Sequence, residues 1–199
     1  CVGRQGNTER LDFVDGAVEI AAYEAVLHLG ELGHCDIAYL GRGSWDLGFN
    51  HWAHQGYMRG IKDLGLSYDS RLATLDLDED PYPRLPVDSS SGKLPFSAII
   101  CSGSMSAIRV LMHLEELGLS VPDDVSIMAI TLGASGLLKT LSPTLSSFDI
   151  CVTTMADKVV DILLQRINES KANQQHVLLQ PRFIQGDTTA SFKKPDVIG

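Results

Sequence analysis

The sequence has no segment that suggests a membrane or a secretion pathway. No apolar run approaches the roughly 20 residues of a membrane-spanning helix, and the first residues do not form the charged-then-apolar pattern of a signal peptide. Basic residues never gather into a run, and the formal net charge is −9. Because an acidic chain without basic patches binds nucleic acid poorly, this composition argues against direct DNA binding by these 199 residues alone.

Signatures of catalysis and of metal binding are weak. The G-x-S-x-G pattern of a hydrolase nucleophile is missing. Gly41-Arg42-Gly43 and Gly48 follow a predicted strand, but their spacing is not the G-x-G-x-x-G of a dinucleotide site. His51 and His54 lie three apart on a predicted helix, yet no third ligand has a matching spacing. We predict a protein that is not an enzyme and that binds neither a cofactor nor a metal.

Cysteine is scarce and shows no pairing pattern. The four cysteines are Cys1, Cys35, Cys101 and Cys151. Cys101 lies within a predicted buried strand, so reduced thiols and a cytoplasmic location are expected.

The stretch from Leu94 to Ile130 is the clearest structural signal in the chain. Its apolar run Ser97–Cys101 is typical of a strand buried on both faces. Apolar residues then recur at helical spacing, with Ser104 or Ser106 as the expected N-cap and Gly118 as the stop. A turn and a second apolar strand follow, and this order predicts a βαβ unit with a right-handed crossover.

The rest of the chain continues this alternation of helix and strand. Helices are predicted over 17–32, around 53–64 and around 155–167, and strands over 37–40, 71–77, 125–130, 176–179 and 182–184. Four prolines and a serine triplet between Asp78 and Pro95 predict a long loop. Alternating helices and strands favour an α/β fold with parallel sheets.

Several segments resemble the effector-binding core of LacI/GalR-family transcription regulators. In "AIICSGSMSAIRVLMHLEELGLSVPDDVSIMAI", residues 98–130, a strand, a polar turn, a helix ending in "LGL-VP-DVS" and a strand follow in the family's order. "LHLGELGHCDIAYLG" at 27–41 and "LSPTLSS" at 141–147 resemble two further family segments. The resemblance implies a periplasmic-binding-protein type of fold, in which two parallel-sheet lobes face each other across a cleft.

The resemblance also implies how the chain is divided. The family's three crossovers between lobes fall near Gly16, Ile150 and Pro181. The C-terminal lobe then comprises residues 16–150 and 181–190 and is nearly complete, whereas the N-terminal lobe is present only as residues 1–15 and 151–180. Residues 191–199 form a tail. Because the chain does not begin with Met and this lobe lacks several strand-helix pairs, we expect that an N-terminal part with a small DNA-binding domain is missing.

The positions at which the family contacts its ligands differ in this chain. The family's helix arginine becomes Ala53, its "N-D" becomes Gly103-Ser104, its "D-D" becomes Thr131-Leu132, and a family aspartate becomes Arg4. Since Arg, Asp and Asn hold sugar hydroxyls by paired hydrogen bonds, weak or no binding of free pentoses and hexoses is expected. Either the cleft serves a more apolar or anionic ligand, or the pocket is degenerate. The candidate ligand-binding residues are Arg4, Asn50, Trp52, Ala53, Ser104 and Thr131.

The resemblance implies a cytoplasmic sensor that binds a small effector, sugar-like or otherwise, between its lobes. Binding would change how a homodimer presents its DNA-binding heads to operator DNA. The expected dimer surfaces are the helix Ser106–Leu117 and the segment after Thr131, which is rich in exposed leucines. A periplasmic sugar-binding protein of a transporter has the same fold and stays the alternative. An α/β enzyme has only the weak glycine and histidine patterns in its favour.

Overall fold

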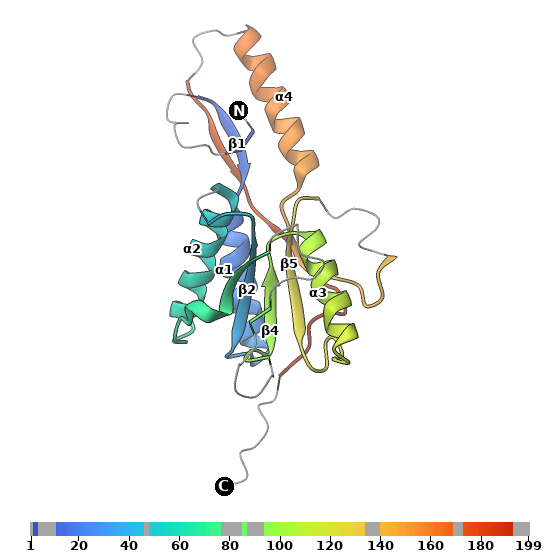
Figure 1. The fold of residues 1–199 in the computed structure, drawn as a ribbon. Coiled ribbons are helices and arrows are strands. Elements are labelled where there is room, and N and C mark those ends of the chain that lie inside the picture. Colours follow the sequence, from blue (N-terminus) through green and yellow to red (C-terminus); the bar gives the residue numbers. More distant parts are fainter. Residues whose placement is uncertain are drawn as a thin grey trace.

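A central parallel sheet dominates the computed structural model, which describes residues 2–3, 11–45, 48–76, 85–86, 94–133, 140–168 and 173–192. The six strands lie in the order β3-β2-β4-β5-β6-β8, and β1 and β7 form a separate two-stranded sheet (Figure 1). The strands are β1 (Phe13–Gly16), β2 (Ile37–Arg42), β3 (Ala73–Asp76), β4 (Ala98–Cys101), β5 (Ser126–Thr131), β6 (Ser146–Asp149), β7 (His176–Leu179) and β8 (Arg182–Ile184). The helices are α1 (Val18–Glu31), α2 (Gly48–Asp63), α3 (Ser104–Glu116) and α4 (Val152–Asn168), and a 3-10 turn covers Ser70–Leu72.

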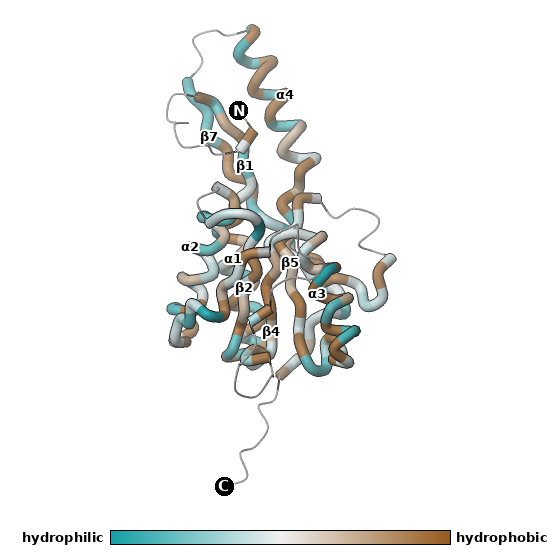
Figure 2. The backbone as a smooth tube through the Cα atoms, viewed as in Figure 1, coloured by the Kyte–Doolittle hydropathy of each residue, from teal (hydrophilic) through white to brown (hydrophobic). Residues whose placement is uncertain are grey.

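The central strands are buried on both faces because helices cover both sides of the sheet. Every residue of β4 and β5 is buried. Successive side chains alternate between two cores: Ile100 packs in the core with α1 and α2, whereas Ile99 packs in the core with α3. Figure 2 shows the hydrophobic residues along these strands. The prediction of an α/β fold with mainly parallel strands is confirmed, and β8, antiparallel to β6, is the exception among the described pairs.

Two glycines allow α1 and α2 to pack closely. A Cβ atom at Gly56 would lie 2.0 Å from the backbone oxygen of Glu19, and one at Gly60 would lie 2.7 Å from Cβ of Val26. Larger residues at these two positions would push the helices apart, so the two glycines set the distance between α1 and α2.

The predicted elements agree well with the structure, with four differences. The helix and strand predictions for 17–32, 37–40, 176–179 and 182–184 are confirmed. The expected serine N-cap of α3 is wrong, because Gly103 is the N-cap and no side chain caps this end. Strands β1 and β6 were not predicted, and the strand predicted over 71–77 starts only after the 3-10 turn. The loop predicted over 78–95 lies mostly outside the described residues.

The two-stranded sheet and α4 stand apart from the larger sheet (Figure 1). β1 pairs in parallel with β7, and Val2 forms an isolated parallel bridge to Val14. The chain passes between the two sheets after β1, after β6, and again between β7 and β8. Among the helices that the structure describes, none combines the length and apolarity needed to cross a bilayer.

A charged pair ties α4 to β1. Arg166 donates to both carboxylate oxygens of Asp12, from Nε at 2.6 Å and from Nη2 at 2.7 Å. These hydrogen bonds, helped by the backbone N–H of Gln175, lower the pKa of Asp12 to about 2. The carboxylate therefore stays ionised and holds the end of the helix against the small sheet.

A buried histidine ties the end of the described chain to the sheet. The Nδ1 atom of His34 lies 2.8 Å from the hydroxyl oxygen of Ser97, and its Nε2 atom lies 3.1 Å from the carbonyl oxygen of Ala190. Because a carbonyl only accepts, the neutral tautomer with the proton on Nε2 fits these contacts. The ring also stacks on Phe192 at a centroid distance of 5.3 Å.

We expect this histidine to make the protein acid-sensitive. Burial lowers the pKa of His34 below its ordinary value of 6.5, so the unfolded chain binds more protons than the folded one between these two values. The contribution of neutral His34 to the free energy of unfolding is therefore fully present above pH 6.5, and it decreases as the pH falls below this value. Urea unfolding at pH 7.5 and 5.5 measures this loss. The loss should shrink in His34→Gln, which removes the titrating group, and persist in the exposed-site control His51→Gln; an equal loss in His34→Gln would contradict the assignment.

Candidate ligand site

A cavity of about 610 Å³ opens at the carboxyl ends of β2, β4 and β5. This is the edge of a parallel sheet at which α/β proteins bind their ligands. The lining comes from the carboxyl ends of these strands, from the residues that follow them, and from the first turns of α2 and α3. The lining residues are Arg42, Gly43, Phe49, Asn50, Ser102, Gly103, Ser104, Met105, Ser106, Ile130 and Leu132.

Asn50 braces the wall of this cavity from the first turn of α2. Its Oδ1 atom accepts from the backbone N–H of Arg42 at 3.2 Å and from the hydroxyl of Ser102 at 3.0 Å. Its Nδ2 atom donates to the carbonyl oxygen of Ser44 at 3.0 Å and to that of Arg42. The side chain is buried, and these bonds hold together the turns after β2 and β4. Asn50 therefore shapes the cavity more than it offers hydrogen bonds to a ligand.

The N-terminus of α3 forms a second wall. Gly103 adopts a φ of +133°, which favours glycine, and no side chain caps the helix. The first turn of a helix carries backbone N–H groups without partners inside the helix and a partial positive charge. Ser104, Met105 and Ser106 of this turn line the cavity, so hydrogen-bond donors and a serine hydroxyl border it.

The remaining wall is apolar. Phe49, Met105, Ile130 and Leu132 supply it from α2, α3 and the end of β5. Ile130 is fully buried, whereas Met105 and Leu132 are each 57% exposed. Two large apolar side chains therefore lie open at the cavity although neither is needed to fill the core.

Of the sequence-predicted site residues, the structure brings Asn50 and Ser104 together in this cavity. Ala53 does not reach it, because it faces the core with 0% exposure. Trp52 is half-buried and packs against the same core. Thr131 is fully buried below the rim, and Arg4 lies outside the described residues.

Thr131 has a structural partner in place of a ligand. Its hydroxyl donates to Oδ1 of Asp149 at 3.2 Å, and the backbone N–H of Gly133 donates to the same oxygen at 2.7 Å. Asp149 is the last residue of β6, and its other oxygen lies 3.9 Å from Nη2 of Arg182. This buried carboxylate therefore fixes the chain that leaves β5 beside the cavity.

Residues that the sequence analysis did not select also line the cavity, above all Arg42, Met105 and Leu132. Arg42 is the last residue of β2, and Leu132 directly follows β5. Their positions at the ends of predicted parallel strands were the available signal.

The histidine pair of α2 has an aromatic rather than a metal-binding setting. The ring of His54 lies 4.6 Å from that of Trp45, and its Nε2 atom lies 3.2 Å from the hydroxyl oxygen of Tyr68. His51 is exposed. Within the described part of the chain, no three His, Cys, Asp or Glu side chains lie together as a metal site would require.

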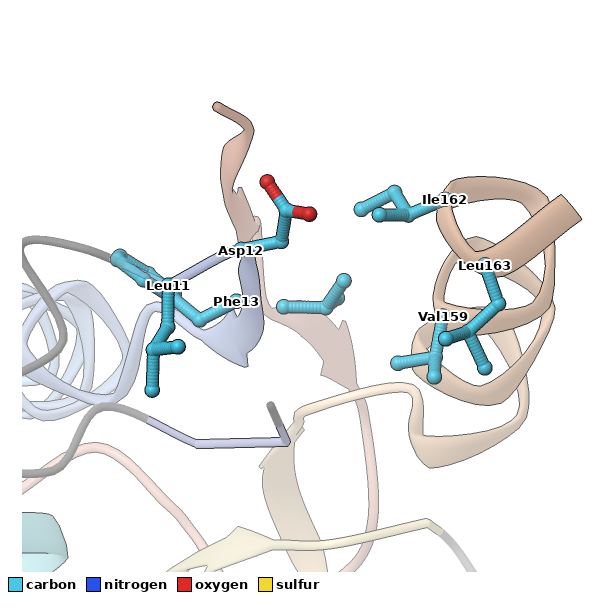
Figure 3. Close-up of a pocket in the computed structure, with 7 residues that line it drawn as sticks. Leu11, Asp12, Phe13, Val159, Ile162 and Leu163 are labelled. Atoms are coloured by element: carbon cyan, nitrogen blue, oxygen red, sulfur yellow. The ribbon is translucent and has the colours of Figure 1, made fainter. Parts of the chain in front are cut away.

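A smaller hollow of about 210 Å³ lies between α4 and β1 (Figure 3). Figure 3 shows Val159, Ile162 and Leu163 on the helix side and Leu11, Asp12 and Phe13 on the strand side. Its one charged lining group, Asp12, is engaged by Arg166. The hollow is thus an apolar gap between packed elements, and the cavity at the sheet edge is the better ligand site.

A family model described as a periplasmic binding protein-like domain matches residues 26–189. The chain belongs to this family. A Bacillus subtilis (strain 168) protein named as an uncharacterized HTH-type transcriptional regulator, YvdE, is 25% identical over 181 residues, which cover 89% of this chain and 55% of the relative. The repressor PurR of Serratia proteamaculans (strain 568) is 24% identical over 186 residues, covering 91% and 53%. The chain therefore spans about half the length of these curated relatives.

Solved structures of LacI-type regulators share the fold of this chain. A putative LacI regulator from Bacillus cereus subsp. cytotoxis aligns with a TM-score of 0.81 at 22% identity, covering 96% of this chain and 68% of that one. A LacI family regulator from Enterococcus faecium with bound ribose aligns with a TM-score of 0.78 at 21% identity, covering 96% and 70%. The resemblance to the effector-binding core of LacI/GalR regulators is thereby confirmed.

Proposed function

We propose that this chain is the effector-sensing core of a LacI/GalR-type transcription regulator. The observation that carries the proposal is the cavity at the carboxyl edge of the sheet, in a chain whose curated relatives include transcriptional regulators. Sensing of this kind needs no chemical reaction, only different affinities for two lobe arrangements. A periplasmic sugar-binding protein has the same fold, but the relatives named above favour a cytoplasmic regulator.

We also propose the two-lobe division 16–150 with 181–190, and 1–15 with 151–180. The two separate sheets and the three passages between them support it. Much of the apolar surface of α4 stays open to water: Val160, Leu163, Leu164 and Ile167 are 53% to 77% exposed. Figure 2 shows hydrophobic residues along this helix. The extra length of the relatives could supply the strands and helices that cover it, together with the part that binds operator DNA.

The proposed regulator acts as a homodimer. Met112 on α3 and Leu117 at its C-cap are more than half exposed, whereas Leu132, also expected at this surface, lines the ligand cavity. Large apolar side chains that cluster on a surface are typical of an interface. The other leucines expected at this surface, Leu137 and Leu138, lie outside the described residues.

The test uses the full-length protein and the DNA upstream of its own gene. We expect specific DNA binding that changes on adding a filtrate of small molecules from the source cells. Ser104→Trp fills the cavity, so this variant should bind the DNA and lose the response, whereas the control Gln55→Trp, at an exposed position of α2, should keep both. Failure of the full-length protein to bind any DNA would rule out a regulator, and an intact response in Ser104→Trp would rule out this cavity.

A further inference from the structure

We infer that the effector presents an apolar face to this lobe, and that Met105 and Leu132 select it. This inference rests on the proposed function and names the ligand class of the same cavity. It concerns aromatic or similarly apolar small molecules, as opposed to free sugars.

The first support is where the apolar side chains lie. Met105 and Leu132 come from different elements, the first turn of α3 and the segment after β5, yet both line one cavity. Each is 57% exposed, and Phe49 of α2 lines the same cavity. A ligand that covers these side chains removes apolar surface from water, which is the main source of affinity in small-molecule sites.

The second support is the state of the polar groups. Free sugars need several acceptors and bidentate groups for their hydroxyls. Of the described lining residues, Asn50 is the one with a side-chain amide, and that amide is held by Arg42, Ser44 and Ser102. None of the described lining residues carries a carboxylate, and Arg42 is the charged residue among them. The described lining therefore offers donors, from Arg42, the serine hydroxyls and the first turn of α3, but no carboxylate acceptor for a set of sugar hydroxyls.

The third support is that the family's sugar-contacting positions have other tasks here. Thr131 is bonded to Asp149, and Ala53 is part of the core. The Thr131 hydroxyl is already engaged, and the Ala53 methyl group cannot form a hydrogen bond, so neither side chain is available to bind a sugar hydroxyl. The apolar rim is therefore the surface that is available for recognition.

Methionine methyl groups provide a direct readout. The chain has five methionines, and Met105 lines the cavity whereas Met58 of α2, which packs against the core, does not. The full-length protein with ¹³C-labelled methionine methyls is titrated with two panels: indole, benzoate and phenyl glycosides, and the free sugars glucose, galactose and ribose. We expect members of the first panel to shift the Met105 signal while the Met58 signal stays in place.

A matched pair of variants measures the contribution of the rim. Leu132→Ser should weaken binding of the best aromatic ligand about tenfold, because most of one apolar side chain is lost from the contact. Leu178→Ser, at an exposed leucine of β7 that lies neither in the cavity nor on the proposed dimer surface, should leave the affinity unchanged. Equal effects of the two variants would overturn the role of Leu132.

The remaining outcomes separate this inference from the proposed function. Shifts of Met105 with free sugars and none with the aromatic panel would overturn the inference and leave the regulator proposal standing. No shift of Met105 with either panel would overturn the inference. If the DNA response to the cell filtrate were also absent, the proposed function would fail as well.

Discussion

Replacing Gly56 with alanine is expected to lower the free energy of unfolding by about 3 kcal/mol or more. An added Cβ would lie 2.0 Å from the carbonyl oxygen of Glu19 and 2.8 Å from its carbonyl carbon. These are backbone atoms of α1, so relief requires one helix to move away from the other. Urea unfolding monitored by circular dichroism measures the loss.

Helix propensity alone predicts the opposite sign for this substitution. Alanine in a helix interior is favoured over glycine by about 1 kcal/mol. The exposed neighbour Gln55 provides the control, because Gln55→Ala should change stability by less than about 0.5 kcal/mol. Gly60→Ala should cost less than Gly56→Ala, since the nearest atom there belongs to the side chain of Val26. A gain in stability for Gly56→Ala would show that the two helices are not in contact at this point.

Restoring the family's arginine at Ala53 is expected to unfold the protein rather than to create a sugar site. The side chain of Ala53 is 0% exposed and lies in the core with α1 and α2. A guanidinium at this position would lie among apolar side chains of the described core, without a carboxylate to pair with. Burying an unpaired charge costs about 4 kcal/mol or more. Thermal unfolding of Ala53→Arg measures the effect.

The control for this substitution is His51→Arg, two residues away on the exposed side of the same helix. It should keep wild-type stability within about 0.5 kcal/mol. A folded Ala53→Arg protein with new affinity for glucose or ribose would contradict the placement of Ala53 in the core.

How much of the fold the sequence predicts depends on where the burial signal comes from. Ala98–Cys101 and Ser126–Thr131 are apolar on both faces, so their runs could be read directly. Strand β6 has the sequence Ser-Ser-Phe-Asp and no such run. Its polar residue Ser146 can be buried because its polar groups have partners. The backbone N–H donates to the Thr188 hydroxyl at 2.9 Å, and the Ser146 hydroxyl lies 3.0 Å from that of Thr189. These partners lie over 40 residues away in sequence, so no local pattern reveals them.

The candidate site shows a similar limit. The family resemblance selects positions, but the direction of each side chain depends on packing that the resemblance does not supply. Asn50 and Ala53 are three residues apart on α2, yet one lines the cavity and the other faces the core. Met105 was not among the residues selected from the sequence, although it is open at the cavity. A general rule about the carboxyl ends of parallel strands would have found Arg42 and Leu132.

The carboxylate of Asp149 joins the segment that follows β5, beside the cavity, to the start of α4. One oxygen holds Thr131 and Gly133, and three residues after Asp149 the helix begins at Val152. With 17 residues, α4 is about 25 Å long. A tilt of about 10° where the helix starts therefore carries its far end through roughly 4 Å. If a shift of the chain beside the cavity tilted the start of α4 by this angle, it would displace the far end of the helix by about the length of a side chain.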